Sequence, residues 1–146
     1  MFIKQISVFL DNKPGRLAQV TRIVTEANVN IRALYVADTA DYGILRMIVD
    51  EPEQAYTALK KDGRTAHLTP VYAVSILDEP GGLHTILSKL GEVGANIEYL
   101  YAFAGRNEQK KAAVVVKVSN FEDSREAVQK SGLTFLSQDD IIDLCR

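Results

Sequence analysis

The hydrophobic positions of this chain follow two periods, and each period predicts one type of element. Alternating apolar residues predict strands, whereas apolar residues three or four apart predict amphipathic helices. The two periods predict strands over residues 2–10, 30–37, 45–49, 64–68, 71–77, 96–103, 114–118 and 133–136, and helices over 17–27, 52–61, 83–93 and 121–130. The segment 139–146 fits a short helix or an added strand, and the pattern does not decide between them.

The same order of elements occurs twice, because the chain contains an internal repeat. The run Pro14-Gly15-Arg16-Leu17 returns 66 residues later as Pro80-Gly81-Gly82-Leu83, and after a longer turn at 105–110 the offset becomes 69. We therefore predict two domains, 1–70 and 71–146. Each has the order β-α-β-β-α-β, which is the ferredoxin-like arrangement of an antiparallel sheet with two helices on one face. The expected fold is α+β, with the two units packed side by side.

Composition narrows the class of protein. Hydrophobic residues make up 47% and charged residues 25%, which is typical of a soluble globular chain. The net charge of −2 argues against a nucleic-acid-binding surface, as does the lack of aromatic residues in 45–50 and 114–119. The lone Cys145 forms no internal disulfide, and neither a signal peptide nor a membrane-spanning stretch is visible, so we expect a cytoplasmic protein without a membrane partner.

Two strand-to-helix turns carry the candidate chemistry. Asn12 precedes the first Pro-Gly pair, and Asp78 precedes the second. The first amides of a helix bind carboxylates, and an Asn or Asp oxygen accepts a hydrogen bond from an ammonium group, so such a turn suits a free amino acid. The same residues are also typical of ordinary helix capping, and both interpretations stay open at this point.

These residues resemble the ACT domain, a small-molecule regulatory module found with many enzymes of amino-acid metabolism. The motif Asn-x-Pro-Gly-x-Leu is followed by Val29-Asn30-Ile31 in the first copy, while the second copy has Asp78 in place of the asparagine and Ala95-Asn96-Ile97. The resemblance covers nearly the whole chain, as two tandem copies with no enzyme domain attached.

The resemblance implies an effector amino acid bound at a seam between two ACT domains. At one seam the resemblance places five residues of the first copy opposite Asn96 and Ile97 of the second: Asn12, Pro14, Gly15, Arg16 and Leu17. At the other seam it places Asp78, Gly81, Gly82 and Leu83, opposite Asn30 and Ile31. The pairing occurs either between the halves or between two chains. Because Asp78 adds a charge and Gly82 removes a side chain, the two sites are not expected to be equivalent.

The function that follows is regulation rather than catalysis. We expect an amino-acid-binding protein that reports its ligand through a change in domain or subunit arrangement, forms a homodimer, and acts on an enzyme or a regulator. A ligand-free assembly module is the alternative, and an enzyme on a ferredoxin-like sheet comes after it. The sequence shows no catalytic triad order, P-loop or metal-ligand spacing, so we expect no catalytic residue, cofactor or metal.

Four further residues are candidates for lining a pocket. Tyr35 and Tyr101 are repeat-equivalent and fit core or rim packing better than a ligand contact. His84 follows the second Gly-Gly-Leu and lies nearer the expected ligand than His67, which falls on a predicted strand.

Overall fold

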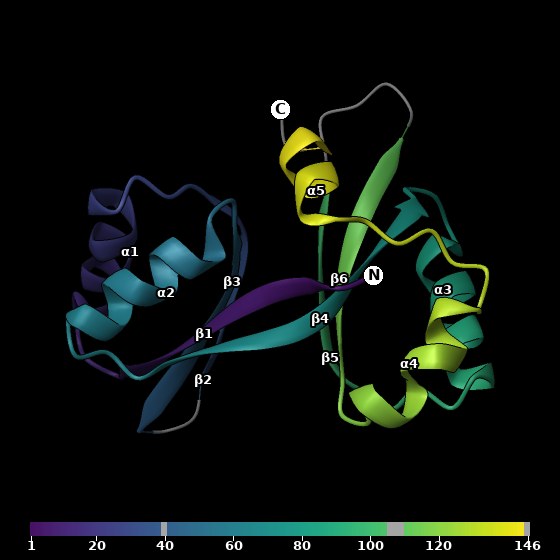
Figure 1. Ribbon diagram of the computed structural model, residues 1–146, viewed down its shortest axis with the longest axis horizontal. Helices are drawn as coiled ribbons and strands as arrows, with labels where there is room; N and C mark the ends of the chain where they lie inside the picture. Colours follow the sequence, from purple (N-terminus) through teal and green to yellow (C-terminus); the bar gives the residue numbers. More distant parts are fainter. Residues whose placement is uncertain (39–40, 105–109, 145–146) are drawn as a thin grey trace. The chain divides into compact units, whose positions relative to one another are not determined.

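The computed structural model describes residues 1–38, 41–104 and 110–144, and Figure 1 follows the chain through them. Its backbone contacts form two compact units: a first unit, Lys4–Thr69, and a second unit, made of Met1–Ile3 and Pro70–Arg146. The elements are β1 (Ile3–Asp11), α1 (Arg16–Glu26), β2 (Ile31–Asp38), β3 (Tyr42–Val49), α2 (Pro52–Lys61), β4 (Ala66–Leu77), α3 (Gly82–Glu92), β5 (Ile97–Ala104), β6 (Lys111–Val118), α4 (Phe121–Gln129) and α5 (Gln138–Leu144).

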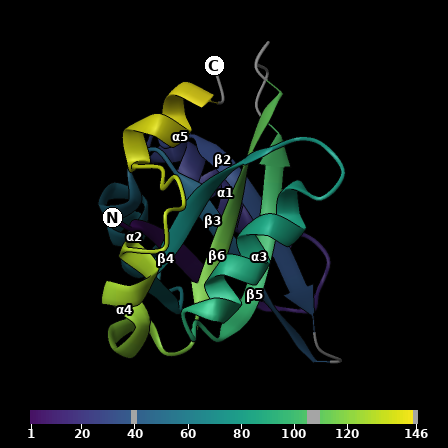
Figure 2. The same cartoon turned by 90° about the vertical axis from the view of Figure 1, so that its right-hand side faces the viewer.

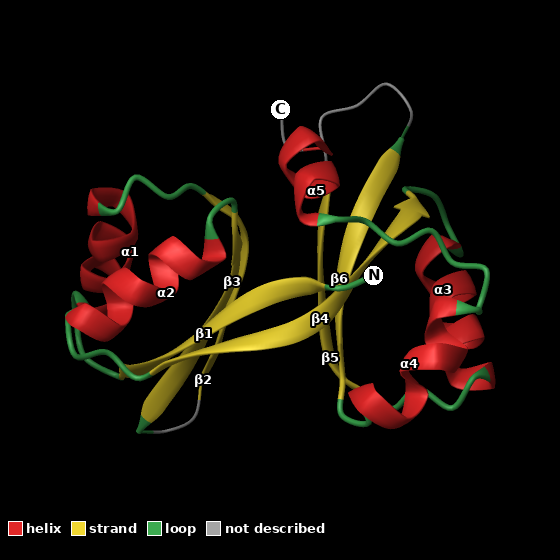
Figure 3. Ribbon diagram, in the orientation of Figure 1, coloured by secondary structure: helices red, strands yellow, loops and turns green. Residues whose placement is uncertain are grey.

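The first unit is an antiparallel sheet covered on one face by two helices. β3 lies between β2 and β1, with Met47 opposite both Ile6 and Leu34, and β4 follows β1. In Figure 3, α1 and α2 lie on the same side of these strands. The side chains between the layers are fully or almost fully buried and include Val8, Val20, Leu45, Met47 and Leu59. The alternating strand positions and the helical stripe therefore meet in one core, as their periods predict.

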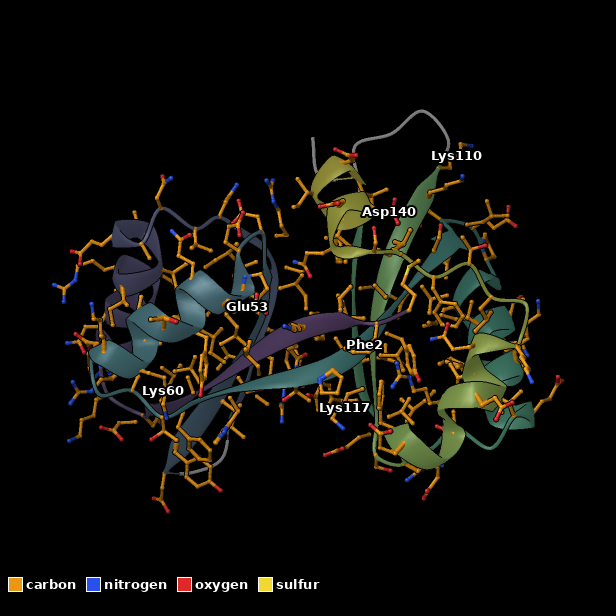
Figure 4. The ribbon with its side chains drawn as sticks, in the orientation of Figure 1. Phe2, Glu53, Lys60, Lys110, Lys117 and Asp140 are labelled. Carbon is orange, nitrogen blue, oxygen red and sulfur yellow. The ribbon has the colours of Figure 1, made fainter. Side chains whose placement is uncertain are left out.

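The second unit repeats this design around β6, which lies between β4 and β5. Its helices α3 and α4 lie on one face of the sheet, the near side in Figure 2. The core between them contains Tyr72, Val74, Ile86, Leu90, Val114, Val116 and Phe121. The N-terminal residues also pack here: the ring of Phe2, labelled in Figure 4, meets Phe121 edge-on with centroids 5.5 Å apart.

The α+β architecture with two βαββαβ-like repeats is confirmed, and three details differ from or complete the sequence prediction. The predicted strand 133–136 is wrong: Phe135 makes only an isolated bridge with Val74. Two flanking hydrogen bonds complete it, from Ser75 N to Thr134 O and from Leu136 N to Ala73 O, before the chain turns into α5. The predicted strands 64–68 and 71–77 form one continuous strand, β4, and the undecided C-terminal segment is a short helix.

The helices end as the sequence predicts. Asn28 and Gly94 follow the ends of α1 and α3 in the left-handed region, with φ of 58° and 77°.

No helix within the described part of the chain is long and apolar enough to cross a membrane.

Candidate functional site

The two candidate turns have nearly the same backbone conformation. Gly15 is the N-cap of α1 with a φ of 82°, and Gly81 is the N-cap of α3 with a φ of 87°. This left-handed conformation strains any residue with a Cβ, which explains a glycine in both copies. Neither helix has a side-chain cap, and the amides of Leu17 and Leu83 have no acceptor among the described residues. Two helix starts are thus left with outward-facing donors.

Asn12 and Asp78 do not cap these helices. The backbone amide of Asn12 donates to Asp41 O at 3.4 Å, and that of Asp78 donates to Lys110 O at 2.7 Å. Their side chains are exposed and make no hydrogen bond within the described ranges. The capping role, which the sequence left open for both residues, is therefore taken by glycine, and both polar side chains remain available.

The two turns differ most at Arg16 and its repeat equivalent Gly82. The guanidinium of Arg16 lies with Nε 3.7 Å from Asp11 Oδ2 and donates from Nη1 to Gln19 Oε1 at 3.2 Å. Gly82 has no room for a side chain, because a Cβ there would overlap the carbonyl oxygen of Leu77. The first turn therefore carries a cation beside the helix start, and the second turn cannot.

A small cavity of about 160 Å³ adjoins the first turn. Asn12, Arg16 and Leu17 line it together with Val36 and Tyr42, which sequence analysis did not identify. Leu17, Val36 and Tyr42 are each more than 40% exposed. Large apolar side chains with this much exposed surface beside a polar turn are typical of a surface that another molecule covers.

The second turn opens on its other side. Gly81 and Gly82 line a larger cavity, of about 310 Å³, that extends toward Leu133 and Thr134. Pro14 and Gly15 line neither of these cavities, and Asp78 and Leu83 lie at the surface beside the second turn. Lys110, whose carbonyl oxygen accepts the amide of Asp78, and Lys111 lie at the start of β6. Arg106 and Cys145 lie outside the described residues.

Asn30 and Ile31 lie at the far end of their own unit from Asn12. The ladder pairs Asp11 with Tyr42 and Ile31 with Val49, so the length of β3 separates the two groups, about 24 Å at 3.4 Å per residue. The same order holds in the second unit for Asp78 and Asn96. One amino acid does not span this distance, so a site that uses both groups requires two units.

The two asparagines at these far ends are held differently. Asn30 and Asp50 are joined by two hydrogen bonds, Asn30 N to Asp50 Oδ1 at 2.9 Å and Asp50 N to Asn30 O at 3.1 Å. The side chain of Asn30 makes no hydrogen bond to any residue that the structure describes. In the second unit the amide of Asn96 donates to Asn120 Oδ1 at 3.0 Å, and its Nδ2 donates to Ser119 Oγ at 2.8 Å. The side-chain NH2 group of Asn96 therefore donates within its own unit. Ile31 and Ile97 pack against the two cores.

The remaining candidates have structural surroundings. Tyr35 accepts a hydrogen bond from Arg46 Nη1 at 2.9 Å, and Tyr101 faces Val115 across the ladder. His84 lies 3.3 Å from Ser88 Oγ on the surface of α3. His67 is exposed on β4. Among the described residues no group of His, Cys, Asp or Glu has the proximity to hold a metal ion.

Comparison with known proteins matches this geometry to one family. The model of the ACT domain pair matches residues 1–145. Among solved structures, protein BT0572 from Bacteroides thetaiotaomicron is similar over 97% of this chain and 96% of its own, with 40% identity and a TM-score of 0.86. The ligand-free regulatory subunit of aspartate kinase from Thermus thermophilus is similar over 88% and 92%, with 18% identity and a TM-score of 0.61. No curated protein matches the chain.

The fold is that of an α+β protein built from two βαββαβ-like units. The chain belongs to the family of ACT domain pairs, which confirms the resemblance seen in the sequence motifs.

Proposed function

We propose that this chain binds a free amino acid at its strand-to-helix turns and signals the occupied state to a partner. Each site consists of the β1–α1 or β4–α3 turn of one unit and the first residues of β2 or β5 of another, in the same chain or in a second copy. The helix amides take the carboxylate, and Asn12 or Asp78 takes the ammonium group. The proposed partner is a cytoplasmic enzyme or regulator.

The observation that carries this proposal is the unused polar side chain at each turn. Helix capping was the competing explanation for Asn12 and Asp78, but the N-cap positions are held by Gly15 and Gly81. An exposed asparagine or aspartate without a hydrogen bond, next to unpaired amides and exposed apolar side chains, is a set of groups suited to a ligand.

Regulation requires that the ligand bind one arrangement better than another. A ligand held by two units stabilises the arrangement that brings them together, in proportion to its difference in affinity. The proposed response is therefore a shift in domain or subunit arrangement, with a homodimer as the expected assembly. The relative from Thermus thermophilus is named a regulatory subunit, which is consistent with this role but, at 18% identity, supports only the fold.

Thermal unfolding against the twenty amino acids tests the proposal. A ligand that binds only the folded state stabilises it by about 2.7 kcal/mol at 100 times its Kd, and raises Tm accordingly. Asn12→Ala and Asp78→Ala are expected to reduce the shift, whereas Asp139→Ala, which removes an exposed carboxylate from α5, leaves it unchanged. An unchanged binding isotherm in both turn variants contradicts the proposal.

A ligand-free assembly module is the second candidate, favoured by Leu17, Leu34 and Val36. These side chains are 42%, 48% and 41% exposed, and two of them lie on β2, the last strand of its sheet. If no amino acid shifts Tm but Leu34→Glu converts a dimer to a monomer in analytical ultracentrifugation, this candidate replaces the first.

A further inference from the structure

The cavity beside the second turn has a filled counterpart in the first unit. Repeat-equivalent hydrogen bonds, Phe9 N to Thr65 O at 3.1 Å and Ser75 N to Thr134 O at 2.9 Å, show that the same backbone frame encloses both spaces. The frames differ in their side chains, so the two units can be compared position by position.

In the first unit three polar side chains occupy this space as a hydrogen-bonded chain. Arg64 Nη2 donates to Gln19 Oε1 at 3.0 Å, and Arg16 Nη1 donates to the same oxygen at 3.2 Å. Arg64 is further held by Asp62, with Nε 3.2 Å from Oδ2. The chain links α1 to the residue two positions before β4, so polar side chains occupy the space that corresponds to the cavity of the second unit.

In the second unit all three positions have smaller or shorter side chains. Gly82 replaces Arg16, Thr85 replaces Gln19, and Leu133 replaces Arg64. Together these three changes empty the space, and a cavity of about 310 Å³ takes its place. This volume lies at the lower limit of small-molecule pockets, roughly 300–1,000 Å³.

A fourth change gives the cavity its charge. Ile23, which is buried in the first core, is replaced by Lys89, which lines the cavity and has no acidic partner among the described residues. Thr85 donates its hydroxyl proton to Gly81 O at 3.0 Å, so its oxygen is left to accept. Glu79 also lines the cavity. The cavity is thus lined by one cation and one carboxylate.

From this coordinated replacement we infer a second binding site, formed by residues of the second unit alone, for the carboxylate of a small organic acid. Lys89 binds the carboxylate, and the space that Gly82, Thr85 and Leu133 leave holds the rest of the molecule. An amino acid adds an ammonium group for Glu79, whereas a plain organic acid does not use that residue. The site shares Gly81 and Gly82 with the turn site of the second unit, and differs from it because every group that it uses belongs to one unit.

The test is a titration of the full chain followed by ¹H–¹⁵N NMR and calorimetry. The probes are the twenty amino acids and, separately, acetate, lactate and succinate. Binding at this site is expected to shift the amide signals of Thr85, Lys89 and Leu133. Affinity for amino acids alone assigns a role to Glu79, and equal affinity for both groups of probes assigns the site to plain carboxylates.

Variants decide whether the cavity is the site. Lys89→Met keeps the length of the side chain and removes its charge, and is expected to weaken binding at least tenfold. The double variant Thr85→Gln with Leu133→Arg restores two of the three residues of the first unit and is expected to abolish binding. The matched control is Lys130→Met, which removes a lysine that is 74% exposed, and it leaves affinity unchanged.

Two outcomes overturn the inference: no probe binds at 10 mM (roughly the weakest affinity of physiological interest), or Lys89→Met binds as the wild type does. Should the double variant fail to fold, Lys89→Met alone still decides. Loss of binding in Asn12→Ala or Asp78→Ala with full binding in Lys89→Met supports the turn sites and refutes this one; the reverse pattern supports this site and refutes those.

Discussion

Gly82 lies directly against the carbonyl oxygen of Leu77, so closely that a Cβ on Gly82 would overlap it. The oxygen belongs to the last residue of β4 and already accepts the amide of Glu79 at 3.0 Å. It is backbone, so it cannot swing away as the end of a flexible side chain does. The start of α3 is therefore fixed to the end of β4 by a contact that only glycine permits.

Gly82→Ala is accordingly expected to destabilise the protein by about 1–3 kcal/mol, because the backbone must shift to admit the methyl group. The matched control is Gly91→Ala in the same helix, where an added Cβ meets nothing within 4 Å. That change is expected to stabilise by roughly 0.5–1 kcal/mol, since alanine favours a helix interior. Urea denaturation measures both, and equal effects of the two changes would refute the steric argument.

Asn120 joins the loop before α4 to the loop between α3 and β5 at the far end of the second unit. Its Oδ1 accepts the amide of Asn96 at 3.0 Å, and its Nδ2 donates to Gly94 O at 2.9 Å. Asn120→Ala is expected to cost roughly 1–3 kcal/mol, because two backbone groups lose their partners. Asn12→Ala removes an asparagine without such bonds and is expected to change stability by less than about 0.5 kcal/mol. A comparable loss in both variants would contradict this assignment of roles.

Tyr72 is fully buried, and its hydroxyl has no hydrogen-bond partner among the described residues. An unpaired buried hydroxyl costs free energy, so Tyr72→Phe is expected to be neutral or to stabilise by up to about 1 kcal/mol at pH 7. Phe121, stacked on Tyr72 with centroids 5.1 Å apart, has no such group, and Phe121→Ala is expected to cost about 3–5 kcal/mol. A large loss in Tyr72→Phe would show that the hydroxyl has a partner.

The same hydroxyl makes stability depend on alkaline pH. Burial raises the pKa of Tyr72, which outweighs the opposing effect of Arg125 nearby. Because the folded state keeps Tyr72 neutral, the free energy of unfolding is unaffected below the tyrosine pKa of the unfolded chain, about 10. It then falls as pH rises from that value through the higher pKa of the folded state. Tyr72→Phe removes this dependence. Unfolding at pH 8 and pH 10.5 measures it, with the partly exposed Tyr56→Phe as control.

The stability of the C-terminal helix α5 decreases at acidic pH because of Asp140. Its carboxylate accepts hydrogen bonds from the Ser137 amide and hydroxyl, both at 2.8 Å, and the amide bond is the main cause of its lowered pKa. This stabilisation is present above the ordinary Asp pKa of about 3.9 and is lost as pH falls through the lower value of the folded state. Asp140→Asn is expected to weaken α5 at pH 7 but not at pH 2.5, by hydrogen exchange, whereas Asp139→Asn has little effect at either pH.

The sequence predicts most of the fold because its two signals agree. Period and repeat both place β1, α1, β3 and their counterparts, and glycine or asparagine at the helix ends fixes the boundaries. It misplaces a strand at 133–136, because a strand needs a partner over its length and Phe135 has one for a single residue only. Local pattern does not report how long a partner strand continues.

The candidate site is only partly visible in sequence. Motifs identify Asn12 and Asp78. The exposure of Tyr42 and Val36, however, depends on which strand lies at the edge of the sheet. The hydrogen bond of the Asn96 side chain depends on a contact 23 residues away. Aligning the repeats shows Arg16, Gln19 and Arg64 replaced by smaller residues, which is the sequence signal of the cavity at Lys89. The alignment does not show that these three positions adjoin one another, because that depends on the fold.

Because the cavity lies within one repeat, its ligand specificity can change through substitutions in that repeat alone. A pocket formed by two surfaces acquires a new ligand only when both surfaces change compatibly. A pocket within one repeat needs single substitutions at Thr85, Lys89 or Leu133, while the duplicate keeps its filled interior and its stability. A change of ligand at this cavity therefore leaves the hydrogen-bonded interior of the other repeat untouched.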